Sequence, residues 1–268
     1  MPPEPSGYLF DLDGTLYIGA EPVPGAAAAI ERLRRRRVPF RFVSNTTSRP
    51  RGALAERLRR LGIEAEPRWI HTPLVAAAEL LAERGHRVIA PFTPVAALGD
   101  LGSVALAGGV SDHPPAANPD AVLIGDLGEQ WTYALLQEAF DYVLGGATLI
   151  ALSRDRYFRR GDRLAIDAGP FVAALEYATG GEAELVGKPS KAFFGGAAAS
   201  LGLAEVSKSI VMVGDDLWSD IRGAQEAGLA GWLVRTGKYR ADALEISGVV
   251  PDRILYSVAE VAAEGGAG

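Results

Sequence analysis

Short apolar runs alternate along the chain with longer segments in which apolar residues recur every three or four positions. Runs of a few consecutive apolar residues are typical of strands that are buried on both faces. We predict such strands at "YLF" (8–10), "VPFRFVSN" (38–45), "ELVGK" (184–188), "SIVMVGDD" (209–216) and "AGWLVRTG" (230–237).

The segments between these runs have the helical repeat. Apolar residues recur at helical spacing in "GAAAAIERLRRRR" (25–37) and in "PRGALAERLRRLG" (50–62), where Gly62 is placed to end the helix. A repeated order of strand, helix and strand predicts an α/β protein with a parallel sheet that helices cover.

The middle of the chain interrupts this order with a second αβ set, from about Pro73 to Glu184. Its strands are expected at "HRVIAPF", "DAVLIGD" and "TLIALS", and its helix at "WTYALLQEAFDYVLGG". Because core strands precede and follow it, this set is interpreted as an insertion. The predicted domains are a core of residues 1–75 and 185–268 and an inserted domain of residues 76–184.

Polar side chains follow four of the predicted core strands. The ends of parallel strands gather ligands at one edge of a sheet. There the chain places two carboxylates in "DLDGT", a hydroxyl and an amide in "VSNTT", an amine in "VGKPS" and three carboxylates in "GDDLWSD"; the residues are Asp11, Asp13, Ser44, Asn45, Lys188, Asp215, Asp216 and Asp220. Together these groups suit a phosphate and a divalent cation.

Each motif also has a purely structural interpretation. A D-x-D sequence at a turn often serves turn chemistry, "SNTTSRP" can cap a helix, and Lys188 can be a solvated lysine before a helix. Acidic residues after the fourth strand can complement a helix dipole. Two carboxylates on one strand end repel each other without a cation or a proton, and three aspartates exceed what a cap requires. This repulsion favours a functional site.

Composition and charge exclude several classes of function. The 268 residues are 48% hydrophobic and 22% charged, with a net charge of −6, so we expect no general attraction to nucleic acid or to a membrane surface. The chain has no cysteine, which excludes thiolate metal sites and cysteine nucleophiles. No apolar run is long enough to cross a bilayer, and the start lacks a signal-peptide pattern, so a cytoplasmic location is expected. The basic run Arg32–Arg37 is interpreted as the solvated end of a helix.

The four motifs, in this order, resemble those of the haloacid dehalogenase superfamily of phosphatases. The insertion between the second and third motifs is similar to the C2-type cap of subgroup IIA. The segments "LIALSRDRYF", "GPFVAALEYATG" and "VRTGKYR" resemble a branch that acts on phospholysine, phosphohistidine and inorganic pyrophosphate. The resemblance implies a Rossmann-like catalytic core with an inserted α/β cap, and a hydrolase of phosphoric ester, phosphoramide or pyrophosphate bonds.

The resemblance also implies roles for the motif residues. Asp11 would be the nucleophile that forms an aspartyl-phosphate, and Asp13 would protonate the leaving oxygen and later accept a proton from water. Asp11, the main-chain carbonyl of Asp13 and Asp215 would hold Mg²⁺. Ser44, Asn45 and Lys188 would bind the phosphate, with Lys188 also stabilising the transition state. Thr15, Asp216 and Asp220 are expected to surround and orient these groups without binding the metal or the phosphate directly.

The cap is expected to choose the substrate, a small phosphorylated molecule. Its segment "SRDRYFRRGD" (153–162) offers Arg154, Tyr157 and Arg160 for an anionic or aromatic leaving group, although a charged surface hairpin explains the same residues. Two further functions stay open, a mutase-like phosphoryl transfer and a catalytically weak protein that binds a phosphorylated ligand. Caps of this type often mediate dimers, so a homodimer through the cap is a further expectation.

Overall fold

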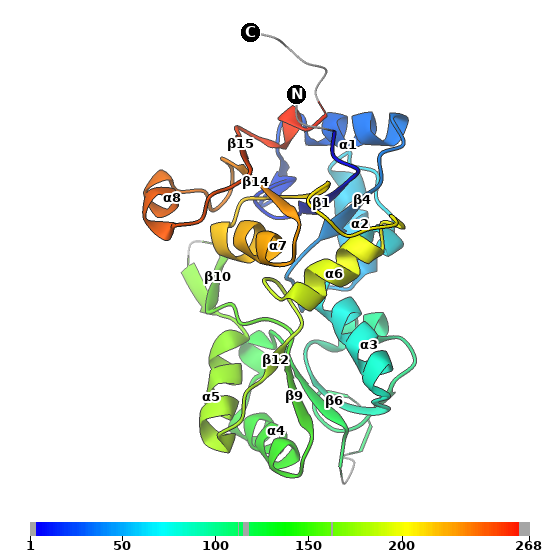
Figure 1. Ribbon diagram of the computed structural model, residues 1–268. Helices are drawn as coiled ribbons and strands as arrows, with labels where there is room; N and C mark the ends of the chain where they lie inside the picture. Colours follow the sequence, from blue (N-terminus) through cyan, green and yellow to red (C-terminus); the bar gives the residue numbers. More distant parts are fainter. Residues whose placement is uncertain (1–3, 112, 115–117, 162, 263–268) are drawn as a thin grey trace. The chain divides into compact units, whose positions relative to one another are not determined.

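The computed structural model describes residues 4–111, 113–114, 118–161 and 163–262. Its chain divides into two compact units (Figure 1). The first is formed by residues within 1–44, 51–71 and 188–268, and the second by residues within 45–50 and 72–187. No helix in the described ranges is both long enough and apolar enough to cross a membrane.

A six-stranded parallel sheet forms the centre of the first unit, in the order β15-β14-β13-β1-β4-β5. Its strands are β1 (Gly7–Asp11), β4 (Phe40–Val43), β5 (Ile70–His71), β13 (Ile210–Gly214), β14 (Ala230–Val234) and β15 (Arg253–Leu255). Every residue of β1 and of β13 is buried, which agrees with the apolar runs "YLF" and "IVMV" within them. These two strands pair at the middle of the sheet, so the residues that follow them emerge side by side.

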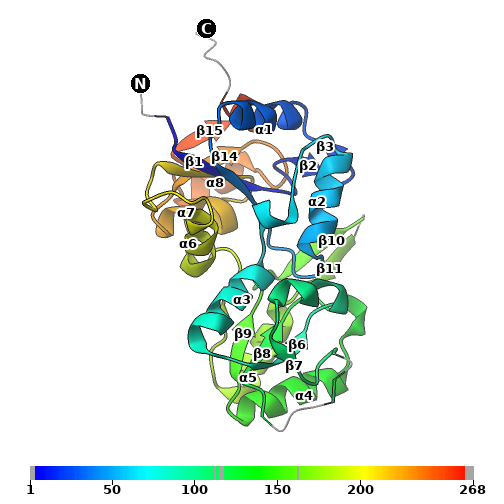
Figure 2. The same ribbon diagram turned by 90° about the vertical axis from the view of Figure 1, so that its right-hand side faces the viewer.

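Helices cover both faces of this sheet (Figure 2). The helices α1 (Ala26–Arg35) and α2 (Arg51–Arg60) pack their apolar stripes on the face that carries Tyr8, Phe10 and Phe42. The opposite face is covered by α6 (Lys191–Ala199) and α7 (Gly223–Glu226), while α8 (Ala241–Ser247) lies further along the chain. The first unit also contains the short hairpin β2 (Tyr17–Ile18) and β3 (Glu21–Pro22).

The basic end of α1 is occupied by contacts within the first unit. Arg32 donates hydrogen bonds to the carbonyl oxygens of Ala259 and Val261. Arg34 pairs with Glu31 at 3.0 Å and also with Glu64, and Arg36 pairs with Glu4. These contacts agree with the interpretation of this run as a helix end.

The second unit contains another parallel sheet, of five strands in the order β12-β9-β8-β6-β7. The strands are β6 (Val88–Phe92), β7 (Ala105–Leu106), β8 (Ala121–Ile124), β9 (Thr148–Ala151) and β12 (Glu184–Leu185). One face packs against α4 (Tyr133–Leu144) and α5 (Gly169–Thr179), and α3 (Pro73–Arg84) also belongs to this unit. An antiparallel hairpin, β10 (Tyr157–Arg160) and β11 (Arg163–Ile166), lies between β9 and α5 in the sequence.

One predicted core strand belongs to the second sheet. Residues 184–188 were expected to form a strand of the core, but β12 covers only Glu184–Leu185 and pairs with β9, with Glu184 opposite Ile150. The prediction was wrong because an apolar run does not specify its neighbour, which depends on the register of pairing. Lys188 therefore follows a strand of the second unit and lies at the start of the chain's return into the first.

Candidate active site

The site lies at the carboxyl ends of the central strands of the first unit. Asp11 is the last residue of β1, and Asp215 directly follows β13, the strand that pairs with β1. Asp220 comes from the short helix η4 (Leu217–Arg222), which begins one residue after the Asp215–Asp216 pair. The pairing of β1 with β13 therefore brings together acidic residues that are about two hundred positions apart in the chain.

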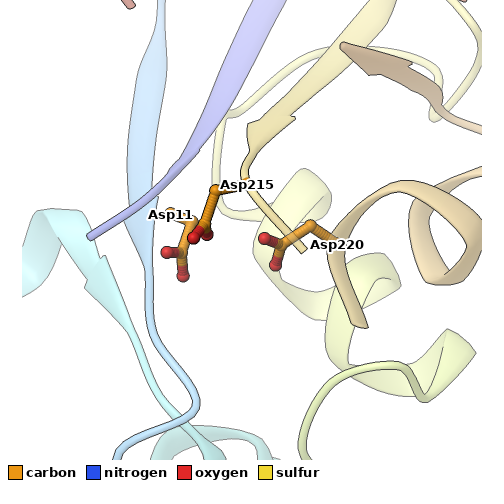
Figure 3. A group of neighbouring side chains, drawn as sticks. All are labelled: Asp11, Asp215 and Asp220. Atoms are coloured by element: carbon orange, nitrogen blue, oxygen red, sulfur yellow. The ribbon is translucent and has the colours of Figure 1, made fainter. Parts of the chain in front are cut away.

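Three buried carboxylates converge at this point. Each of Asp11, Asp215 and Asp220 offers one oxygen, and these oxygens lie within 4.8 Å of one another. Figure 3 shows the Asp220 carboxylate directed toward the other two. Carboxylates this close repel each other strongly in a site that excludes water, so the cluster calls for compensating positive charge.

Lys188 supplies part of that positive charge. Its Nζ donates to Asp11 Oδ1 at 2.5 Å and to Asp220 Oδ1 at 2.6 Å, and all three side chains are buried. Burial by itself would lower the pKa of Lys188, but the two adjacent carboxylates outweigh it and raise the pKa. Lys188 is therefore a fixed cation beside the predicted nucleophile.

Two glycines press against Asp215. A Cβ atom built on Gly14 or on Gly237 would lie 2.0 Å from Asp215 Oδ2, and both glycines have positive φ angles. The same oxygen accepts a hydrogen bond from the backbone N–H of Lys238 at 2.6 Å. Asp215 is thus held through one oxygen by backbone that approaches more closely than any side chain would allow.

The electrostatics of Asp215 fit a metal ligand. Burial, followed by the charges of Asp11 and Asp220, raises the pKa of Asp215. One amine, Lys188, cannot neutralise three carboxylates, and Mg²⁺ prefers oxygen ligands of this kind. The residues present therefore fit a divalent cation, which would relieve the repulsion that raises this pKa.

Asp13 lies in the turn after β1 and is exposed, in contrast to Asp11. Partial enclosure of its carboxyl group, together with the negative charge of Asp11, raises the pKa of Asp13, while Arg57 and a backbone hydrogen bond from Gly19 act in the opposite direction. A raised pKa favours the protonated form that a general acid requires. The neighbouring Thr15 is fully buried, and its Oγ1 has no hydrogen-bond partner among the described residues.

Asp216 and Asp220 have different hydrogen-bond partners, although both were expected to orient the groups of the site. The Asp216 Oδ1 accepts hydrogen bonds from Trp218 N–H and Ser219 N–H and so caps η4, while its Oδ2 pairs with Lys238 Nζ at 3.0 Å. Asp220 instead holds Lys188 and accepts a hydrogen bond from Asp216 N–H at 3.1 Å. Of these two aspartates, only Asp220 contacts Lys188 in these hydrogen bonds.

The two predicted phosphate ligands of the second motif fall in different units. Ser44 directly follows β4 in the first unit, where its backbone N–H donates to His71 O at 3.1 Å. Asn45 belongs to the second unit, and its amide Nδ2 donates to Asp155 Oδ2 at 3.0 Å. The binding of phosphate by these residues stays a prediction.

The cap residues proposed for substrate choice lie on and beside the hairpin. Arg154 donates to both carboxylate oxygens of Glu176 and to Ala183 O, so its guanidinium is engaged within the second unit. Tyr157 is 58% exposed on β10, and Arg160 on the same strand pairs with Glu129 at 3.2 Å. Asp162 of the predicted segment lies outside the described residues. The hairpin interpretation of this segment is confirmed, and the role of its side chains in substrate choice stays a prediction.

Sequence reasoning assigned no role to the residues of the loop that follows β14, although its segment "VRTGKYR" contributed to the family resemblance. Thr236 Oγ1 donates to Gly14 O, Gly237 packs against Asp215, and Lys238 contacts both Asp215 and Asp216. The signal was present, because "RTGK" follows a predicted core strand as the other motifs do. No role was assigned because its polar residues suggested no catalytic function on their own.

Comparisons with known proteins agree with this geometry. A family model described as haloacid dehalogenase-like hydrolase matches residues 8–101, and one described as HAD-hydrolase-like matches residues 185–261. The haloacid dehalogenase-like hydrolase domain-containing protein 2 of Rattus norvegicus is 45% identical over 233 residues, which are 87% of this chain and 85% of that protein. The human phospholysine phosphohistidine inorganic pyrophosphate phosphatase is 36% identical over 243 residues, covering 87% of this chain and 84% of its own.

A solved structure is similar over nearly the whole chain. The crystal structure of glycerol phosphate phosphatase from Mycobacterium tuberculosis in complex with magnesium has a TM-score of 0.81 and 30% sequence identity, and the match covers 95% of this chain and 75% of that one. The matches to sequence and structure agree with the four motifs and with the α/β fold. The chain belongs to the haloacid dehalogenase-like hydrolases and is an enzyme of their phosphatase group, which hydrolyses phosphoric ester bonds.

Proposed function

We propose that this enzyme is a Mg²⁺-dependent phosphatase that hydrolyses a small phosphorylated substrate through an aspartyl-phosphate on Asp11. The observation that carries the proposal is the buried contact of Lys188 with Asp11 and Asp220, beside a third carboxylate, Asp215. The three carboxylates outnumber this one amine, and a bound metal ion would offset the excess negative charge and allow an anionic phosphate group to approach.

Residues of the first unit would bind the reacting phosphoryl group. Lys188 and the Ser44 hydroxyl would hold its non-bridging oxygens, and Lys188 would stabilise the charge that develops on them in the transition state. The Asp11 and Asp215 carboxylates and the main-chain carbonyl of Asp13 would hold Mg²⁺, which when bound supplies positive charge that screens the carboxylates from the phosphate.

The first chemical step forms a bond between a carboxylate oxygen of Asp11 and phosphorus. The bond from phosphorus to the leaving oxygen breaks in the same displacement, and the protonated Asp13 gives its proton to that oxygen. Asp13 suits this task because partial enclosure of its carboxyl group and the charge of Asp11 raise its pKa. The product of this step is an aspartyl-phosphate and a neutralised leaving group.

Hydrolysis of the intermediate restores the enzyme. The Asp13 carboxylate accepts a proton from a water molecule whose oxygen attacks phosphorus, and the bond between phosphorus and the Asp11 oxygen breaks. Phosphate leaves, Asp11 is again a carboxylate, and Asp13 is again protonated. A second hydroxyl in place of water would give a mutase-like transfer by the same steps.

The test is phosphate release from p-nitrophenyl phosphate by the purified protein, with and without Mg²⁺, beside Asp11→Asn. We expect metal-dependent release, and a loss of at least about a thousandfold in the variant, because an amide cannot act as the nucleophile. Unchanged turnover by Asp11→Asn would reject the assigned nucleophile. Absence of release from this ester and from a panel of phosphorylated metabolites would favour the ligand-binding alternative.

A further inference from the structure

The loop after β14 places a lysine, Lys238, beside the cluster of Asp11, Asp215 and Asp220. Thr236 ties this loop to Gly14, the residue next to Asp13, and Gly237 packs so closely that a Cβ there would lie 2.5 Å from the Gly14 Cα. The backbone of Lys238 then reaches Asp215. The position of Lys238 is therefore fixed relative to both Asp13 and Asp215 by contacts within the first unit.

The ammonium of Lys238 lies outside the buried cluster. Its Nζ is 3.0 Å from Asp216 Oδ2, and its side chain is 68% exposed, whereas Lys188 is buried between two carboxylates. Its backbone N–H donates to Asp215 Oδ2 at 2.6 Å, two residues after Thr236, whose hydroxyl is hydrogen-bonded to the carbonyl oxygen of Gly14, the residue next to Asp13. Lys238 thus acts electrostatically on the outer, solvent-facing side of the site.

A second cation, Arg57 of α2, lies beside the turn that follows Asp13. Arg57 lies over the ring of Tyr17, with 4.2 Å between its Cζ and the ring centroid, and donates a hydrogen bond to Gly19 O. Tyr17 forms a backbone bridge with Asp13, and its carbonyl oxygen accepts a hydrogen bond from Gly14 N–H at 2.7 Å. Two cations from different elements of the first unit therefore lie beside the turn that carries Asp13.

These cations lie near the leaving group if the proposed mechanism holds. The reacting phosphoryl group belongs with Asp11, Ser44 and Lys188, while Asp13 must reach the leaving oxygen. Groups that surround Asp13 on its exposed side therefore adjoin the part of the substrate that departs. A negative charge on that part would be stabilised there, and a neutral part would gain nothing from the charge of Lys238.

We propose that Lys238 is a specificity-determining residue that selects phosphoryl donors whose leaving group carries a negative charge of its own. The inference rests on the proposed function and names the substrate class of the same site. Phosphoanhydrides and phosphate esters of hydroxy acids belong to this class, and esters of uncharged alcohols and phenols do not.

The experiment compares pyrophosphate, whose leaving group is an anionic phosphate, with p-nitrophenyl phosphate, which has no second anionic group before reaction. The ratio of kcat/KM for the two substrates is measured at saturating Mg²⁺ in wild type, Lys238→Met and Lys208→Met. Lys208 is the matched control, because it is 74% exposed, lies 3.9 Å from its own partner Asp252, and precedes β13 at the opposite end of the sheet. We expect the ratio to fall about tenfold in Lys238→Met, as for the loss of one partly screened charge pair, and to stay unchanged in the control.

Two further variants separate the charge of Lys238 from its other effects. Lys238→Met leaves Asp216 without its cation, and the released carboxylate could repel an anionic substrate by itself. The double variant Lys238→Met with Asp216→Asn removes both charges and keeps a good helix cap. We expect the ratio to stay low in the double variant and to return in Lys238→Arg; recovery in the double variant would assign the effect to Asp216 and overturn the proposal.

The outcomes distinguish this proposal from the function on which it rests. If no substrate is hydrolysed in a metal-dependent way, the proposed function fails and the inference falls with it. If p-nitrophenyl phosphate is hydrolysed but the ratio is the same in Lys238→Met and wild type, only the inference is wrong. Hydrolysis of that ester by a wild type that neither cleaves pyrophosphate nor is inhibited by it would also overturn the inference alone.

Discussion

The two parallel sheets of this chain use the carboxyl ends of their strands in different ways. In the second unit the polar groups at these ends satisfy one another: Thr93 Oγ1 donates to Thr47 O at 2.7 Å, and Asp126 N–H donates to Thr47 Oγ1 at 2.8 Å. In the first unit the ends of β1 and β13 carry buried carboxylates that repel each other. The same architecture therefore carries a group of mutually hydrogen-bonded residues in the second unit and a cluster of carboxylates with unbalanced charge in the first.

This comparison indicates that the strand ends of the first unit form a binding site because their carboxylates require more positive charge than the chain supplies. The segment Asn45–Pro50 completes the second unit by occupying its strand ends, as the contacts of Asn45 and Thr47 show. The first unit supplies Lys188 to its cluster, and this single amine leaves a deficit of positive charge.

The largest effect is expected from Lys188→Ala. Removal of the only cation that touches Asp11 and Asp220 in the described contacts should lower kcat by about a thousandfold, because the transition-state charge loses a fixed partner. It should also destabilise the metal-free fold by about 3 kcal/mol, since buried carboxylates are left uncompensated. Steady-state turnover and urea unfolding measure the two effects.

A double variant shows whether charge causes that loss of stability. Lys188→Ala with Asp11→Asn removes one cation and one carboxylate, so we expect it to recover part of the lost stability without recovering turnover. Equal stability of the single and double variants would indicate that lost packing, and not repulsion, dominates.

The next effect concerns His71, a strand-end residue of the first unit that is neutral and not part of the acidic cluster. Burial, with a smaller contribution from Arg51, lowers the pKa of His71 from 6.5 to about 4. Between these values the unfolded chain binds a proton that the folded protein does not, so the free energy of unfolding should fall as the pH drops from about 6.5 to 4. The contribution amounts to about 3 kcal/mol over that window and is fully present above pH 6.5.

Urea unfolding at a series of pH values tests this expectation. His71→Gln should lose this component of the pH dependence, whatever its effect on stability at pH 7. A variant with the same slope as wild type between pH 6.5 and 4 would show that another group titrates there.

The smallest effect is expected from a substitution in the second unit, at Thr47. Thr47→Val keeps the shape of the side chain but removes the acceptor of the Asp126 N–H, so it should reduce the free energy of unfolding by about 1–3 kcal/mol. Mg²⁺ affinity, measured by calorimetry, should not change, because Thr47 belongs to the hydrogen-bonded group of the second unit and not to the carboxylate cluster. A large loss of metal affinity would contradict the separation of roles between the two units.

Much of the fold and the acidic cluster could be predicted from the sequence. Uninterrupted apolar runs located β1 and β13, and the rule that polar residues gather at strand ends identified Asp11, Lys188 and Asp215, which the structure brings together. Both signals are local in the sequence.

What sequence reasoning missed depends on pairing between distant segments. The register that assigns β12 to the second sheet, and the position of Asn45 in the second unit, follow from tertiary contacts that no single segment encodes. The contacts of Lys238 with Asp215 and Asp216 were equally hidden, because they join two loops that follow neighbouring strands.

The close approach of Gly14 and Gly237 to Asp215 has a consequence for how this enzyme can evolve. A methyl group at either glycine would collide with the carboxylate, so two positions with no reactive atom are as intolerant of replacement as a catalytic residue. A Gly237→Ala substitution, which appears conservative in a list of variants, would displace Asp215 or open the loop. The lineage can therefore vary its substrate through exposed side chains such as Lys238 while the backbone beneath them is held constant.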